Sequence, residues 1–141
     1  MNRILANLEP HSVWSYFEDI CQIPRPSKKE EAIGRFLIEF AQKHNLFAQK
    51  DEAGNVLIRK PASPGYETRP VVILQSHMDM VCEKNSNSSH NFDKDPIIPW
   101  IDDEWVKAKG TTLGADDGIG MAAQMARSEE HTSELQSRQV I

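Results

Sequence analysis

Cysteines and long apolar runs are scarce in this sequence. Its 141 residues include only two cysteines, Cys21 and Cys82, which lie far apart and form no CxxC spacing. This argues against a disulfide framework and against a cysteine zinc cluster, and it makes a reducing cytoplasm the simpler setting. No apolar run approaches the roughly 20 residues that a membrane span needs, and residues 1–9 lack the apolar core of a secretory signal. We therefore expect a cytoplasmic protein with no membrane partner.

Basic residues are also too few, and too scattered, for a nucleic acid partner. The chain has 16 Lys and Arg residues against 21 Asp and Glu residues, a net charge of −5, and it has no dense basic run. A phosphate backbone is therefore not an expected ligand. The sequence also lacks a glycine-rich phosphate loop and a G-x-S-x-G nucleophile elbow. Phosphate binding and catalysis by a nucleophilic serine therefore do not compete with the metal binding described below.

Two amphipathic segments near the start of the chain predict helices. Apolar residues recur at helical spacing over residues 11–21, with Ser12 available as a cap. After two prolines, Ser27 and Glu30 have the spacing of a capping box, which predicts the start of a second helix that should end near Asn45. The expected apolar face of this second helix consists of Ile33, Phe36, Leu37, Phe40 and Ala41.

The rest of the chain alternates short strands with loops and a third helix. Residues 56–58 are a strand candidate, and the continuous apolar run 71–74 is typical of a strand buried on both faces. Residues 100–106 suit a hairpin around an acidic turn, and residues 114–117 form a tight loop that leads into a helix from about Gly118. This order of elements predicts an α/β fold with helices packed on a mixed sheet.

The candidate metal-binding residues lie where the 71–74 strand ends and where the third helix begins. His77 and Asp79 follow the 71–74 strand, at the kind of strand end where open sheets bind ligands. A neutral imidazole can bind a metal, and a carboxylate two residues on can bind the same metal or orient the imidazole. Asp116 and Asp117 lie in the tight loop before the third helix. Taken alone, each motif also suits an ordinary structural role, because Asp-Asp-Gly is a common turn and N-cap signal.

Together, in this order, the two motifs resemble the co-catalytic zinc aminopeptidase, carboxypeptidase and dipeptidase superfamily. The longer segments 77–85, 90–97 and 111–120 are similar to the aminoacyl-histidine dipeptidases, the cytosolic non-specific dipeptidases of bacteria. Residues 8–10 and 23–27 are similar as well, so that the resemblance extends from about residue 8 to about residue 126.

The resemblance implies a role for three residues. His77 would be a ligand of one zinc, Asp116 the carboxylate that bridges two zincs, and Asp79 the catalytic-site acid that orients His77. In that family two metals polarise the scissile carbonyl and activate a water molecule, while a glutamate moves protons. The implied substrates are dipeptides, of the Xaa-His type and others. For Asp117 we favour a structural role at the helix start over a role behind the metal.

Other histidine and acidic residues fit the metal chemistry less well. His90 lies near Asp93 and Asp95, but a solvated polar loop is the simpler interpretation of that segment.

The family's general-base glutamate and its remaining metal ligands have no counterpart in the matching segments. We therefore expect a fragment in which residues 1–126 are part of a catalytic domain, inactive alone and with apolar surface exposed.

The end of the sequence has a different character. Residues 127–141 lose the apolar pattern and resemble the translation of a short-read sequencing adapter, which predicts a non-native, irregular tail. On this interpretation Glu129 and Glu130 are not the family's glutamate pair. Two alternatives stay open: a non-catalytic domain that binds a metal or a partner, and a chain whose activity depends on partner chains that supply the missing ligands. The sequence does not determine the dipeptide preference, the physiological metal or the oligomeric state.

Overall fold

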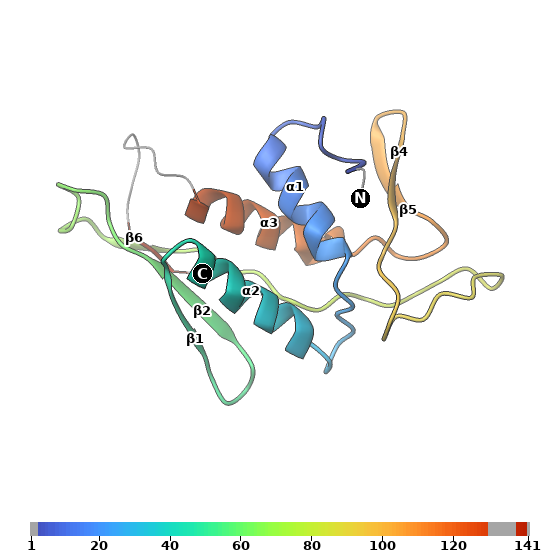
Figure 1. Cartoon of the computed structure of the whole chain (residues 1–141), viewed down its shortest axis with the longest axis horizontal. Coiled ribbons are helices and arrows are strands. Elements are labelled where there is room, and N and C mark those ends of the chain that lie inside the picture. Colours follow the sequence, from blue (N-terminus) through green and yellow to red (C-terminus); the bar gives the residue numbers. More distant parts are fainter. Residues whose placement is uncertain (1–2, 130–137, 141) are drawn as a thin grey trace.

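The computed structural model describes residues 3–129 and 138–140 and combines three helices with six short strands (Figure 1). The helices are α1 (His11–Cys21), α2 (Glu31–Lys43) and α3 (Ala115–Glu129). The strands are β1 (Phe47–Lys50), β2 (Val56–Lys60), β3 (Val71–Ile73), β4 (Pro99–Asp102), β5 (Trp105–Ala108) and β6 (Arg138–Val140).

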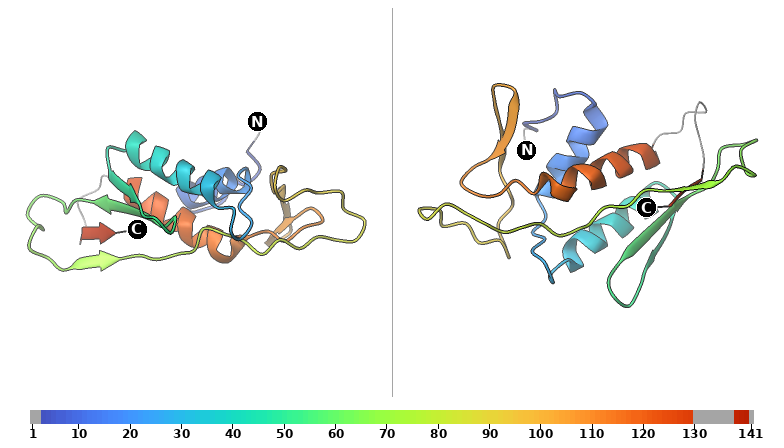
Figure 2. Two further views of the ribbon diagram at one scale, coloured as in Figure 1. Left: turned by 90° about the horizontal axis from the view of Figure 1, so that it is seen from below. Right: turned by 180° about the vertical axis from the view of Figure 1, so that it is seen from behind.

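Four of the strands form a mixed sheet, as predicted. Their order is β1-β2-β6-β3, with antiparallel pairing between β1 and β2 and between β2 and β6, and parallel pairing between β3 and β6. Strands β4 and β5 form a separate antiparallel hairpin, which confirms the hairpin expected over residues 100–106. The helices lie on one side of the four-stranded sheet (Figure 2, left). The α/β class expected from the order of elements is therefore confirmed.

The core lies between the three helices and β2. Its buried apolar side chains include Phe17 and Ile20 of α1, Ile33 and Leu37 of α2, and Met121 of α3. Burying side chains of this size stabilises the fold by roughly 1.5–3 kcal/mol each. The predicted apolar face of α2 is confirmed, except that Phe36 is only partly buried. No helix within residues 3–129 is long and apolar enough to cross a membrane.

Both predicted helix caps were wrong. Helix α1 has Pro10 at its N-cap position, and no side chain, including that of Ser12, caps it. Helix α2 starts only at Glu31, so that Ser27 is too far upstream to bond its first amides. The Ser27 hydroxyl instead donates to the Asp79 carboxylate, while Glu30 accepts from the amide of Lys28 at 2.7 Å. A tertiary partner has therefore replaced the local one.

The burial expected for the 71–74 run was also wrong. The structure confirms a strand there, but Val71 is 49% exposed and Ile73 is 72% exposed. Among the described residues, the strand that pairs with β3 is β6, and no helix makes a substantial contact with β3. The apolar surface that we expected to be exposed is present here. Helix α3 continues to Glu129, and β6 is a strand, within a segment expected to be irregular; residues 130–137 and 141 lie outside the described part.

A buried arginine joins the segment that follows β3 to the segment that precedes α3. Arg25 is 2% exposed, and its guanidinium donates to the carbonyl oxygens of Met78 at 3.1 Å, Asp79 at 3.0 Å and Gly114 at 2.5 Å. Burial lowers the pKa of Arg25, but a guanidinium stays charged in proteins. Gly114 has a φ of 72°, and a Cβ atom there would lie 2.6 Å from the Arg25 guanidinium. Only glycine allows the approach that this contact requires.

The Arg25 contacts predict a large loss of stability on substitution. Arg25→Met should lower the free energy of unfolding by about 3 kcal/mol, because it leaves three carbonyl groups without their donor. Arg3→Met is the matched control: Arg3 also bonds a carbonyl oxygen and the Asp19 carboxylate, but it lies at the surface and should contribute at most about 1 kcal/mol. Urea unfolding of the two variants gives the comparison, and equal losses would contradict a special role for Arg25.

Candidate metal site

The two motifs singled out in the sequence meet in the structure. His77 lies just beyond the end of β3, and Asp116 lies in the first, non-helical residues of α3. Although they are 39 residues apart in the chain, His77 Nε2 is 3.0 Å from Asp116 Oδ1. The other ring nitrogen, Nδ1, is 3.0 Å from Asp79 Oδ1. The three residues predicted for the site are therefore in direct contact.

The imidazole of His77 lies between two carboxylates, and these set its charge. The hydrogen bond with Asp116 raises the pKa of His77, a partial loss of hydration opposes this, and the hydrogen bonds with Asp79 raise the pKa further. The Ser27 hydroxyl, which donates to Asp79, lowers the pKa of that carboxyl group, and His77 lowers it as well. In the absence of a metal this arrangement favours the protonated form of His77.

The pair His77 and Asp116 fits the geometry of two ligands on one metal ion. Zinc binds imidazole nitrogen and carboxylate oxygen at about 2.0–2.2 Å, so two such ligands in a tetrahedral arrangement are about 3.4 Å apart. The observed 3.0 Å requires only a small outward movement. The side chain of Asp116 is 96% exposed and that of His77 is 52% exposed, so an ion can reach both. Within residues 3–129, however, no group of three or more His, Cys, Asp and Glu side chains is placed to hold a metal.

Asp79 is placed behind His77 rather than beside Asp116. One carboxylate oxygen faces His77 Nδ1, and the other accepts from Ser27. A carboxylate in this position fixes the tautomer of a histidine and leaves Nε2 free for a metal. Ser27 is a site residue that the sequence analysis missed, because its spacing to Glu30 also matched a helix cap. Its proximity to Asp79 depends on the pairing of Pro26 with Met80, which no local pattern indicates.

The neighbouring Asp117 has a different position. Asp116 and Asp117 both have non-helical backbone angles, and the peptide bond between them is cis. The Asp117 carboxylate folds over the first turn of α3, so closely that a Cβ atom on Gly120 would collide with it. This contact supports the structural role that we favoured for Asp117.

The His90 loop, the other candidate in the sequence, uses its acidic groups elsewhere. Asp93 pairs with Lys29 at 2.8 Å, and Asp95 accepts from the amide of Asn91 at 2.7 Å. His90 Nε2 is buried without a hydrogen-bond partner in the structure, and its ring packs against Phe92. The loop therefore does not assemble a metal site.

The contacts of His77 predict a specific pH behaviour for the metal-free chain. NMR titration with a chelator present should show that Asp116→Asn lowers the pKa of His77 more than Asp79→Asn does, whereas Asp19→Asn on α1 leaves it unchanged. Because the pKa is raised in the folded state, the stabilisation from these contacts is complete below about pH 6.5 and is lost as pH rises through the raised pKa. An unchanged pKa in Asp116→Asn would contradict the contact.

Known proteins resemble this chain in both sequence and fold. No family model matches the chain. Over 122 residues it is 51% identical to a cytosol non-specific dipeptidase from Escherichia coli (strain K12), and the match covers 86% of this chain and 25% of that protein. The crystal structure of aminoacylhistidine dipeptidase from Vibrio alginolyticus matches with a TM-score of 0.90 and 46% identity over 96% of this chain and 28% of that one.

A more distant structure agrees in fold. A tripeptidase from Staphylococcus aureus has a TM-score of 0.71 at 22% identity, over 94% of this chain and 36% of that one, which shows a shared fold alone. The chain spans about a quarter of the length of its two nearer relatives. The sequence identity and the structural match agree with the contact between the two motifs. The chain belongs to the family of aminoacylhistidine and cytosol non-specific dipeptidases.

Proposed function

We propose that residues 1–126 are part of the catalytic domain of a metal-dependent dipeptidase that acts in the cytoplasm on dipeptides of the Xaa-His type and others. The observation that carries this proposal is the contact of His77 Nε2 with Asp116 Oδ1 at 3.0 Å, with Asp79 on the opposite ring nitrogen. It combines a metal-ligand pair with the acid that orients the histidine, on a fold shared with peptidases.

The proposed roles combine the contacts of the side chains with the family resemblance. His77 and Asp116 would hold zinc, and the resemblance implies that a complete site would share the Asp116 carboxylate between two ions. When bound, zinc polarises a scissile carbonyl and lowers the pKa of a bound water molecule. Asp79 keeps the proton of His77 on Nδ1, so that Nε2 offers its lone pair to the metal.

We further propose that this chain does not turn over dipeptides alone. Its described residues supply two proposed metal ligands, and no group of three or more His, Cys, Asp and Glu side chains among residues 3–129 is placed to hold an ion. Asp79 contacts the opposite nitrogen of the imidazole instead. Glu129 does not serve as the general base in this proposal, because Tyr16 donates to its carboxylate at the far end of α3. Residues 127–141 are proposed to be non-native, and sequencing of the genomic locus across their codons tests this directly.

Metal binding is the first test of the proposed site. In isothermal titration with zinc, we expect weak binding that is abolished by His77→Gln and by Asp116→Asn, the two ligand variants. Asp79→Asn should weaken binding about 10- to 100-fold, because an orienting partner is lost. Affinity should fall as the pH drops below the pKa of His77, since protons compete for the ligand.

The control for this experiment is His90→Gln. It removes the histidine of the loop that contains Asp93 and Asp95, and we expect zinc binding to stay unchanged. Binding that survives His77→Gln but is lost in His90→Gln would move the metal to the loop and contradict the proposal.

Catalysis is tested separately, with alanyl-histidine as substrate and zinc in excess. We expect no hydrolysis by the chain alone above that in protein-free buffer, because the described residues provide no full ligand set. Release of free histidine, measured by chromatography, gives the rate. Hydrolysis that disappears in Asp79→Asn would show that the chain is an enzyme by itself, whereas zinc binding without hydrolysis fits both a catalytic fragment and a non-catalytic metal-binding domain.

A further inference from the structure

The segment between α1 and α2 brings one hydroxyl group to the proposed metal site. The carbonyl of Pro26 accepts from the amide of Lys29 at 3.0 Å, and Lys28 has a φ of 69°, so residues 26–29 form a tight turn of type II character. The third residue of such a turn is usually Gly or Asn, because other side chains rarely adopt a positive φ. Here it is a lysine, and the residue before it, Ser27, donates its hydroxyl to the Asp79 carboxylate.

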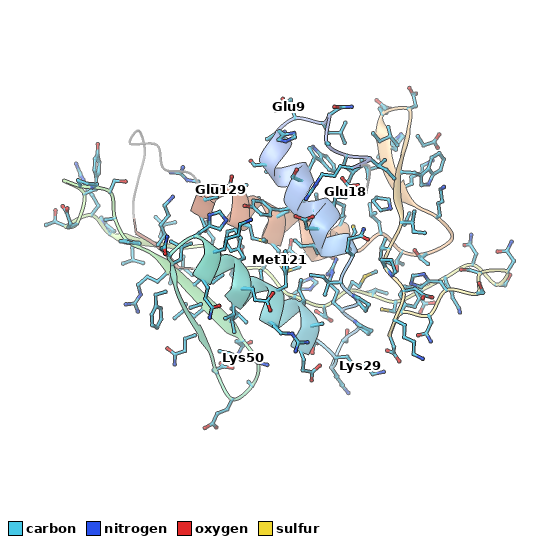
Figure 3. The ribbon with its side chains drawn as sticks, viewed as in Figure 1. Glu9, Glu18, Lys29, Lys50, Met121 and Glu129 are labelled. Atoms are coloured by element: carbon cyan, nitrogen blue, oxygen red, sulfur yellow. The ribbon has the colours of Figure 1, made fainter. Side chains whose placement is uncertain are left out.

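Other contacts hold this turn in place. Pro26 pairs with Met80 in a parallel bridge, which ties the turn to the segment that carries the site. On the solvent side, Lys29 Nζ donates to the Asp93 carboxylate at 2.8 Å (Figure 3, where Lys29 is labelled). Neither contact involves the Ser27 hydroxyl, so the turn should keep its place when that hydroxyl is removed. A rarely adopted backbone conformation that its surroundings maintain motivates a functional hypothesis.

His77 has a carboxylate at each ring nitrogen, and a neutral imidazole has one proton for the two of them. Nδ1 is 3.0 Å from Asp79 Oδ1, and Nε2 is 3.0 Å from Asp116 Oδ1, so distance does not decide which nitrogen keeps the proton. The surroundings of the carboxylates do differ. The Asp116 side chain is 96% exposed, whereas that of Asp79 is 32% exposed and its second oxygen accepts from Ser27. A carboxylate that is already oriented loses less rotational freedom on accepting the ring proton.

We propose that Ser27 is a positioning residue of the metal site. Its hydroxyl holds Oδ2 of Asp79, so that Oδ1 stays on Nδ1 of His77 and the proton of the neutral ring stays there too. Nε2 then has its lone pair directed toward Asp116, where zinc would bind. The inference rests on the proposed function as far as zinc is concerned, whereas the contacts from Ser27 through Asp79 to His77 are tested without metal.

The first experiment uses the intact chain in metal-free buffer, at one fixed pH that is high enough for a neutral imidazole. Ser27→Thr and Ser27→Val have side chains of the same shape and differ in the hydroxyl group. The nitrogen chemical shifts of the His77 ring report its tautomer. We expect Ser27→Thr to keep the Nδ1–H form and Ser27→Val to raise the ratio of Nε2–H to Nδ1–H about 2- to 10-fold. Equal ratios in the two variants, or a shift toward Nδ1–H in Ser27→Val, would overturn the inference.

Ser76→Ala is the matched control for this experiment. Ser76 adjoins His77 in the chain, but its hydroxyl donates to Gln124 of α3 at 3.0 Å and not to Asp79. We expect the tautomer ratio of this variant to equal that of the unaltered chain. A shift as large as that in Ser27→Val would show that the loss of any nearby hydroxyl disturbs the ring, and would contradict a specific role for Ser27.

Zinc binding tests whether Ser27 acts through Asp79. In isothermal titration with zinc chloride, Ser27→Val should bind about 3- to 10-fold more weakly than Ser27→Thr, because the orienting carboxylate is less well held. In an Asp79→Ala background the two Ser27 variants should bind zinc equally, since no carboxylate is left to orient. A difference that persists in that background would overturn the positioning role. Failure of the unaltered chain to bind zinc would instead contradict the proposed function, and the tautomer ratios would still decide the role of Ser27.

Discussion

The contacts of the Arg25 guanidinium are the constraint on which the site depends. A charged group that is 2% exposed is costly unless its donors are satisfied, and here they bond carbonyl oxygens from two segments far apart in sequence. One segment carries His77 and Asp79, and the other leads through Gly114 to Asp116. Because one rigid, planar group binds both backbones, it fixes the distance between the two proposed ligands. Apolar packing alone would leave that distance much less exact.

The acidic surroundings of His77 have a physical consequence for metal binding. Asp79 and Asp116 both stabilise the protonated imidazole, so a metal must displace a proton that the site itself retains. The same two carboxylates lower the electrostatic cost of bringing a divalent cation to the site. The retained proton explains why we expect zinc affinity to fall as the pH drops below the pKa of His77. Asp79 then contributes in both states, since its bond to Nδ1 is present with either a proton or a metal on Nε2.

Local patterns in the sequence predicted the helices better than the site. Helix α1 was predicted with its exact bounds, because its apolar face repeats every three to four residues. The contact of His77 with Asp116 was expected only through resemblance to a family, since nothing local brings residues 39 positions apart together. Ser27 was misassigned as a helix cap, because a serine three residues before a glutamate has the same spacing whether its hydroxyl meets an amide or a distant carboxylate. The predicted burial of β3 was wrong. An apolar run indicates that a strand favours burial, but it does not show that another element packs against the strand.

The backbone on the two sides of His77 is held to different degrees by the described residues. Residues 78–80 are held firmly, by the Arg25 guanidinium and by the bond from the amide of Met80 to the carbonyl of Arg25 at 3.1 Å. Residues 74–77 have no backbone bonds to described residues, although the Ser76 hydroxyl donates to Gln124 at 3.0 Å. Among the described contacts, the backbone after His77 is therefore held more firmly than the backbone before it. A ligand set is most precise when it is built on rigid elements. The direction in which the imidazole points toward Asp116 therefore depends on the Arg25 contacts that follow His77 in the chain.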